Sequence, residues 1–248
     1  MMEVRQVNAG NGWNWISGGF AIFKQSPVIW IALFFIYVLI GMALSIIPVI
    51  GPIVFNVLAP VFMAGFMMGC RALDMGEEIE INHLFAGFKQ NTSQLIAVGG
   101  IYLAALIVIV GVVLLASGAA PLSHMTTEEL LGGQHAAAAG EGMLLPLLIV
   151  LAAMVPLFMA YWFAPTLVLF HDMKALDAMK LSFVACLRNI MPFFVYSLIS
   201  MVLMVLAAIP LGLGLLVMIP TMTASLYVSY KDIFAIQLAE QEGAAVEL

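Results

Sequence analysis

The chain has 248 residues, of which 64% are hydrophobic and 9% are charged, and its formal net charge is -6. Soluble domains carry about 25% charged residues, so this composition excludes an ordinary soluble protein and indicates an integral membrane protein. Its eight Lys and Arg residues are scattered along the sequence, which excludes a basic surface for nucleic acid.

Membrane spans can be placed from the gaps between charged residues. Two stretches, 25–70 and 189–230, contain no Asp, Glu, Lys or Arg and are each about twice the ~20 residues that one helix needs to cross the hydrocarbon core. Helix breakers around Pro48 and Pro210 divide each stretch into two spans. Two further apolar segments supply one span each. The six predicted spans are 28–47, 53–73, 94–116, 143–170, 191–209 and 213–230.

The cations predict how these spans are oriented. With six spans, every Lys and Arg lies on the same side of the membrane: Arg5, Lys24, Arg71, Lys89, Lys174, Lys180, Arg188 and Lys231. The positive-inside rule makes this side the cytoplasm and places both termini there. The first 15 residues lack the apolar core of a cleavable signal peptide, so we expect the first span to direct insertion.

A six-residue motif occurs three times, as FAIFKQ at 20–25, FAGFKQ at 85–90 and VACLRN at 184–189. Each copy precedes an odd-numbered span and lies on a segment whose apolar residues recur at helical spacing, which is typical of an amphipathic helix lying in the membrane interface. The apolar positions are Trp13, Ile16, Phe20 and Phe23 in the first segment, Ile81, Leu84, Phe85 and Phe88 in the second, and Leu176, Met179, Phe183 and Leu187 in the third.

These repeats predict the architecture. Two spans follow each motif, so the three units enter the membrane in the same direction. We therefore predict an all-α membrane protein with a single membrane domain, 1–248, in which six transmembrane helices form three parallel hairpin repeats, each preceded by an amphipathic interfacial helix. The boundaries are approximately 12–76, 80–173 and 174–234 for the units, 117–142 for an external loop and 235–248 for a C-terminal tail.

The motif cations Lys24, Lys89 and Arg188 stand where each interfacial helix meets its span. A cation at that depth can bind a lipid headgroup phosphate, which is one hypothesis for these residues. The alternative is that they only enforce topology and finish a helix.

A second element recurs in the even spans, where Pro60, Pro156 and Pro220 are expected to kink their helices. Acidic residues follow each proline at Asp74, Asp172 and Asp232.

Small residues also follow the first and third prolines at the same spacing: Gly65, Gly69, Ser225 and Ser229. A small-xxx-small pattern allows close helix packing, so we interpret the prolines as packing devices. In the second unit Tyr161 and Pro165 occupy these positions, and we expect its span to pack differently.

Residues for chemistry are sparse. No span carries an ionisable residue at its middle, and the adjacent His171 and Asp172 are not accompanied by a catalytic motif. Cys70 and Cys186 lack metal-binding spacing, and the methionines lack a repeated exposed series that would favour cuprous ion. We therefore expect no catalytic residues, no metal, no cofactor and no enzymatic activity.

The stretch APTLVLFHDMKALDAMKLSFVACLRNIMPFF at 164–194, with GWNWISGGFAIFKQSP near the start and the six-span layout, resembles an uncharacterised family of proteobacterial inner-membrane proteins. That family is similar in layout to the membrane domain of some glycerophosphodiester phosphodiesterases. The resemblance implies a helical bundle in the bacterial inner membrane and transfers no activity.

Two functions are compatible with the sequence. The first is a non-catalytic inner-membrane protein that binds membrane lipids, another membrane protein or a second copy of itself, in a scaffold, accessory or envelope-homeostasis role. The second is a transporter or lipid-translocating carrier. A polar interior cavity would favour the second, and its candidate lining residues are Asn56, Ser197, Ser200, Thr221 and Thr223.

Overall fold

The computed structural model describes residues 4–116 and 133–246, and over these residues all regular secondary structure is helical. The helices are α1 (Asn11–Gln25), α2 (Pro27–Ser45), α3 (Ile50–Asp74), the 3₁₀ helix η1 (Ile81–Phe88), α4 (Thr92–Ala116), α6 (Gly133–Trp162), α7 (Ala164–His171), α8 (Ala175–Arg188), α9 (Ile190–Ala208) and α10 (Leu215–Val246). Of the external loop predicted over 117–142, residues 117–132 lie outside the described residues. The remainder is a correction to the prediction, because α6 begins at Gly133 and residues 133–142 are helical.

Five segments are long and apolar enough to cross a membrane: Pro27–Ser45, Ile50–Asp74, Thr92–Val113, Pro146–His171 and Ile190–Ala208. They fall where the first five spans are predicted. The sixth predicted span, 213–230, forms the first half of α10, which is not among these segments in the described chain because hydroxyl residues and then Lys231 lower its hydropathy. Helix α10 also continues to Val246, so the predicted tail 235–248 is helical along most of its length.

The fourth predicted span is not one continuous helix, because the chain breaks at Phe163 between α6 and α7. Pro165 has no N–H to donate, and its ring would clash with a carbonyl one turn earlier if α6 continued. Ser182 of α8 fills the break. Its hydroxyl accepts a hydrogen bond from the Phe163 N–H at 2.9 Å and donates one to the Met159 carbonyl at 2.7 Å. The break is therefore held open by a residue from another helix.

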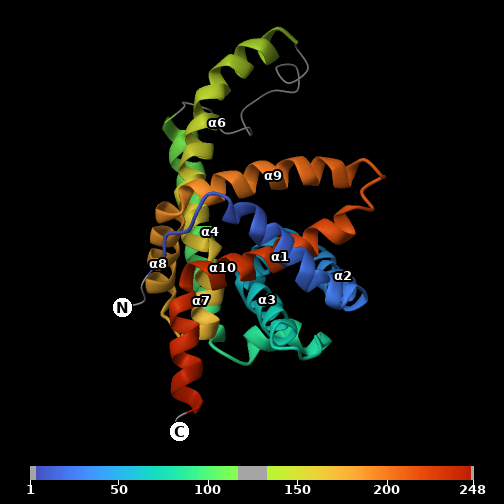
Figure 1. Cartoon of the computed structure of the whole chain (residues 1–248). Helices are drawn as coiled ribbons and strands as arrows, with labels where there is room; N and C mark the ends of the chain where they lie inside the picture. The colour runs from blue at the N-terminus through green and yellow to red at the C-terminus, as the bar shows by residue number, and fades with distance from the viewer. Residues whose placement is uncertain (1–3, 117–132, 247–248) are drawn as a thin grey trace.

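The three short helices that carry the motif copies, α1, η1 and α8, are here called the leading helices. α1 packs on α10 and α9, η1 packs on α3, and α8 packs on α6 and α7. Figure 1 shows α1 running across α10, and the N-terminal segment passing close to α8. η1 and α8 therefore lie against helices that precede them closely in the chain, whereas α1 lies against helices from the opposite end of the chain.

This packing divides the predicted apolar face of α1. Ile16 and Phe23 are buried, Trp13 and Phe20 are 52% and 42% exposed, and Trp15, outside the predicted face, is 1% exposed. Burial is decided by contact with α10, because a Cβ atom placed on Gly19 would lie 2.5 Å from the Thr221 carbonyl oxygen. α1 is thus a packed element of the core as well as an amphipathic segment.

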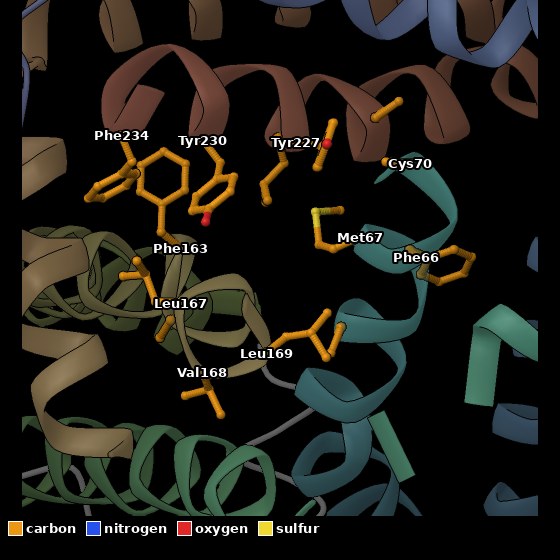
Figure 2. Close-up of a cluster of buried hydrophobic side chains, with 14 of the residues drawn as sticks. Phe66, Met67, Cys70, Phe163, Leu167, Val168, Leu169, Tyr227, Tyr230 and Phe234 are labelled. Carbon is orange, nitrogen blue, oxygen red and sulfur yellow. The ribbon is translucent and has the colours of Figure 1, made fainter. Parts of the chain in front are cut away.

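The centre of the core lies where α3, α7 and α10 converge (Figure 2). Met67, Phe163 and Tyr227 each lie seven residues after one of the recurring prolines, and all three are buried there. Phe163 lies against Phe234 with ring centroids 5.6 Å apart, in an edge-to-face arrangement. The centre of the interior is thus built by the C-terminal half of α3, by Phe163 with α7, and by the middle of α10.

Candidate functional site

The motif cations stand at the C-terminal ends of the leading helices. Lys24 lies in the last turn of α1, Lys89 caps η1 and Arg188 closes α8. A positive charge at this position is stabilised by the carbonyl end of the helix dipole. All three side chains are exposed, and the Lys24 ammonium lies 5.1 Å from the centroid of the Phe20 ring. Each is therefore open to an external anion.

Arg188 differs from the two lysines because it also contacts the N-terminal segment. Its guanidinium donates a hydrogen bond to the Val4 carbonyl at 3.4 Å. The neighbouring Asn189 is fully buried, accepts from the Val7 N–H at 2.9 Å, and donates to the carbonyls of Arg5 and Ala185. Sequence reasoning missed this structural role. The one available signal was the shorter Asn in place of the Gln found in the other two copies.

Two of the predicted packing residues, Gly65 and Ser225, lie against leading helices. A Cβ atom placed on Gly65 would lie 2.2 Å from the Leu84 carbonyl oxygen of η1, and only a residue without a side chain allows this approach. A Cβ atom placed on Gly69 would lie 2.7 Å from Ile79 Cδ1, the end of a side chain that precedes η1. In α10, Ser225 faces Gly19 of α1, and the buried Ser229 hydroxyl donates to the carbonyl of Leu226 in its own helix.

The recurring prolines lie inside assigned helices: Pro60 in α3, Pro156 in α6 and Pro220 in α10. Pro60 and Pro220 are buried, whereas Pro156 is exposed. The kinks expected at these positions stay a prediction.

The recurring acids join residues that are distant in the sequence. Asp74 pairs with Lys231 and accepts from the Tyr227 hydroxyl at 3.2 Å. Asp232 accepts from the Trp15 indole N–H at 2.8 Å and from the Asn11 amide at 2.7 Å. In the same way, Asp172 accepts from the side-chain amide of Asn91. A small cavity of about 100 Å³ lies beside Asp74, between Arg71, Phe170 and Tyr230.

A larger hollow lies between α6, α8 and α9, and the sequence did not predict it. Its volume is about 660 Å³, and its walls are formed largely by apolar side chains, including Val155 and Phe158 of α6 and Phe194 of α9. We call it the α6–α9 groove. Trp162 closes one part of the wall, and its buried indole nitrogen has no hydrogen-bond partner in the described structure.

The groups considered for metal binding or catalysis are not gathered together. Among the described residues, no three His, Cys, Asp or Glu side chains form a cluster suited to a metal ion. Both cysteines are buried, and in α8 burial raises the pKa of the Cys186 thiol to about 12, so this thiol stays protonated at neutral pH.

Comparison with known proteins gives one informative relative. Over 259 aligned positions, which cover 95% of both chains, the sequence is 32% identical to a protein of Burkholderia thailandensis that is described as a probable inner membrane protein. No protein-family model matches the chain. No solved structure matches it. The expected similarity to the membrane domain of glycerophosphodiester phosphodiesterases is not shown by these comparisons.

Proposed function

The chain belongs to the family of this Burkholderia thailandensis inner membrane protein, and we propose that it is a non-catalytic lipid-binding protein with a scaffold or accessory role in the inner membrane. The observation that carries the proposal is the placement of Lys24, Lys89 and Arg188. Three exposed cations end three separate leading helices, where each can bind the phosphate of an anionic lipid.

A six-span layout with α10 as the last span underlies this proposal. The hydroxyl residues that lower the hydropathy of α10 are directed into the protein, because Thr221, Ser225 and Ser229 are all buried. Polar side chains at membrane depth are tolerated when they face a neighbouring helix instead of lipid. The side of α10 that packs on α1 is thus its polar side, which supports a transmembrane position for this helix.

Equivalent contacts support three parallel units. Gly65 lies five residues after Pro60 and packs on Leu84, which directly precedes the second motif. Ser225 lies five residues after Pro220 and packs on Gly19, which directly precedes the first motif. The same pair of positions thus brings a leading helix onto the closing helix of a different unit. This relation is expected if the units are arranged around a common axis.

Contacts among the cationic segments support termini on the cytoplasmic side. Lys231 pairs with Asp74 of α3, and Arg71 lies over the ring of Phe170. The backbone N–H of Arg5 donates to the Ile233 carbonyl, which joins the N-terminal segment to α10. Three cations that are distant in sequence therefore gather at one end of the bundle, as the positive-inside rule requires.

The carrier alternative has less support. Four of its five candidate cavity residues bond the carbonyl groups of their own helices: Asn56, Ser197, Thr221 and Thr223. Hydroxyl groups bound in this way are satisfied locally and do not require an aqueous route. A protein partner, such as another membrane protein or a second copy, is the remaining alternative to lipid as the ligand.

The test is a triple variant, Lys24→Gln, Lys89→Gln and Arg188→Gln, extracted in a mild detergent and weighed by native mass spectrometry. Each cation near the surface contributes about 1 kcal/mol of attraction to anionic lipid, so we expect bound cardiolipin or phosphatidylglycerol to fall about fivefold for each site lost.

The matched control removes three other cations, through Arg5→Gln, Lys174→Gln and Lys180→Gln, and should retain its lipid. The double variant Lys24→Gln, Lys89→Gln separates the effect on lipid from the Arg188 contact with Val4. Equal lipid retention in the test and control triples would contradict the proposal.

A further inference from the structure

The small cavity beside Asp74, here called the Arg71 cavity, lies where two candidate membrane spans end. Arg71 is in the last turn of α3, and Phe170 is in the last turn of α7. These two helices end segments that are long and apolar enough to cross a membrane. The third wall of the cavity comes from the middle of α10. The cavity therefore lies near the membrane interface, where phosphate groups of lipids and of dissolved molecules are both within reach.

The charges around this cavity are positive in sum. Arg71 and Lys231 line it together with one acidic residue, Asp74. Both cations lie eleven residues after a recurring proline, Pro60 or Pro220, and the packing of α3 on α10 brings these equivalent positions together. Two cations beside one small space attract an anion more strongly than either does alone.

The single acid does not neutralise Arg71. Asp74 lies three residues after Arg71 on the same helix, a spacing at which the two side chains could pair. Instead, Asp74 pairs with Lys231 and accepts a hydrogen bond from the Tyr227 hydroxyl at 3.2 Å. Among the described residues this is the one ion pair, so the charge of Arg71 has no carboxylate partner there.

Aromatic packing holds the Arg71 guanidinium at the cavity. The side chain is half-buried, and its guanidinium carbon lies 5.4 Å from the centroid of the Phe170 ring. The Phe170 ring centroid lies 5.8 Å from that of Tyr230, a fully buried residue that also lines the cavity. A guanidinium stacked on an aromatic ring keeps its N–H groups available at its edge, because they lie in its plane.

The size and charge of the cavity favour a small anion. Its volume of about 100 Å³ is roughly three times the ~30 Å³ that one water molecule occupies in the liquid. This space fits a phosphate group but not a whole nucleotide. A guanidinium can bind two phosphate oxygens at once, and the Lys231 ammonium adds a second positive charge.

We propose that the Arg71 cavity binds a phosphate group, whose oxygens accept hydrogen bonds from the Arg71 guanidinium and the Lys231 ammonium while Asp74 positions the lysine. The group belongs either to a lipid that ends in a phosphate or to a dissolved phosphate. This site is separate from the three motif cations, so it goes beyond the proposed lipid-binding function and is tested independently of it.

The test offers two probes to the full chain, inorganic phosphate and phosphatidic acid, a lipid that ends in a phosphate group. Equilibrium dialysis measures radiolabelled phosphate bound to the protein in phosphatidylcholine nanodiscs. Native mass spectrometry measures the phosphatidic acid that the protein retains. Binding of the first probe would identify a dissolved phosphate as the ligand, and retention of the second alone would identify a lipid.

A change of the arginine tests its role directly. Arg71→Gln should weaken binding of the probe at least about tenfold, the effect of losing a hydrogen bond to a charged group. Arg71→Lys keeps the charge but cannot bind two oxygens at once, so we expect a smaller loss. Arg5→Gln is the matched control, because it removes an exposed guanidinium that does not line the cavity, and it should leave binding unchanged.

A second pair of variants tests the cavity without changing its cations. Met75 lines the cavity, is 57% exposed and follows the last residue of α3, so its substitution should not disturb folding. Met75→Glu supplies a carboxylate that can pair with Arg71, and it should weaken binding at least about tenfold. Met75→Gln has nearly the same shape without the charge and should leave binding unchanged.

The site would be overturned if neither probe distinguished Arg71→Gln from Arg5→Gln, or Met75→Glu from Met75→Gln. Competition by acetate as strong as that by phosphate would overturn the ligand class, by making a carboxylate the occupant. The triple variant of the motif cations should still bind the probe in an Arg71-dependent way. Failure of the Arg71 cavity and failure of the proposed function are therefore separate results.

Discussion

The last residue of the repeated motif has a different structural role in the third copy than in the first two. Gln25 and Gln90 are exposed, whereas Asn189 is buried and makes two hydrogen bonds to the N-terminal segment and a third to the Ala185 carbonyl of α8, which together attach that segment to the end of α8. The motif could be found from sequence because its spacing is local. The role of Asn189 could not, because its partners are about 180 residues away in the chain.

Removing the Asn189 amide should loosen the N-terminal segment. We expect Asn189→Ala to lower the free energy of unfolding by about 2–4 kcal/mol, since it leaves the Val7 N–H and two carbonyls without their partner. Unfolding in detergent, followed by thermal denaturation, measures the loss, and trypsin cleavage after Arg5 should accelerate. Gln25→Ala is the control and should change stability by about 0.5 kcal/mol or less. An equal loss of stability in Asn189→Ala and Gln25→Ala would contradict the structural role assigned to Asn189.

At the scale of elements, close backbone approach decides how the helices pack. Gly65 admits the backbone of η1, and the Ser182 hydroxyl occupies the break between α6 and α7. The long apolar helices α2, α3, α4 and α9 could be predicted to within a few residues because uninterrupted hydrophobic runs determine them. The break at Phe163 has a local signal in Pro165, but the Ser182 hydroxyl that fills it comes from α8 and could not be predicted from periodicity.

Two substitutions in α3 compare the importance of its contact with η1 and of its proline. Gly65→Leu should destabilise the protein by at least about 3 kcal/mol, because its first side-chain atom already meets the Leu84 backbone. Pro60→Ala should cost less, since it restores a backbone donor inside α3.

Thermal denaturation in detergent compares the two with Gly100→Leu, whose added Cβ meets no atom within 4 Å. A larger loss with Pro60→Ala would show that α3 depends on its proline-induced shape.

At the scale of the whole molecule, the number of spans determines where the termini lie. The sequence predicts six, and five described segments are apolar enough by themselves. From sequence alone, α10 is difficult to assign as a membrane span because it carries polar residues. The structure shows that these residues are buried on the side of α10 that packs on α1. Likewise, the buried face of α1 depends on α10, and the α6–α9 groove depends on two helices diverging. Such features depend on contacts between distant segments, and the spacing of apolar residues along the sequence does not predict these contacts.

Fusion reporters distinguish five spans from six. A reporter inserted near Gly132 should be periplasmic, and one fused after Leu248 should be cytoplasmic if α10 crosses the membrane. A third reporter, inserted at Glu77 between α3 and η1, should also be cytoplasmic by the same prediction. Activity of the Leu248 fusion in the periplasm would place α10 outside the set of spans and would dismantle the three-unit arrangement.

The bond between Trp15 and Asp232 joins residues 217 positions apart. Ribosomes add about 5–20 residues per second, so the first helix is synthesised about 10–40 s before its acceptor exists. Until α10 is synthesised, α1 lacks the backbone against which Gly19 packs and the carboxylate that holds Trp15. The first helix can therefore take its final position only at the end of translation.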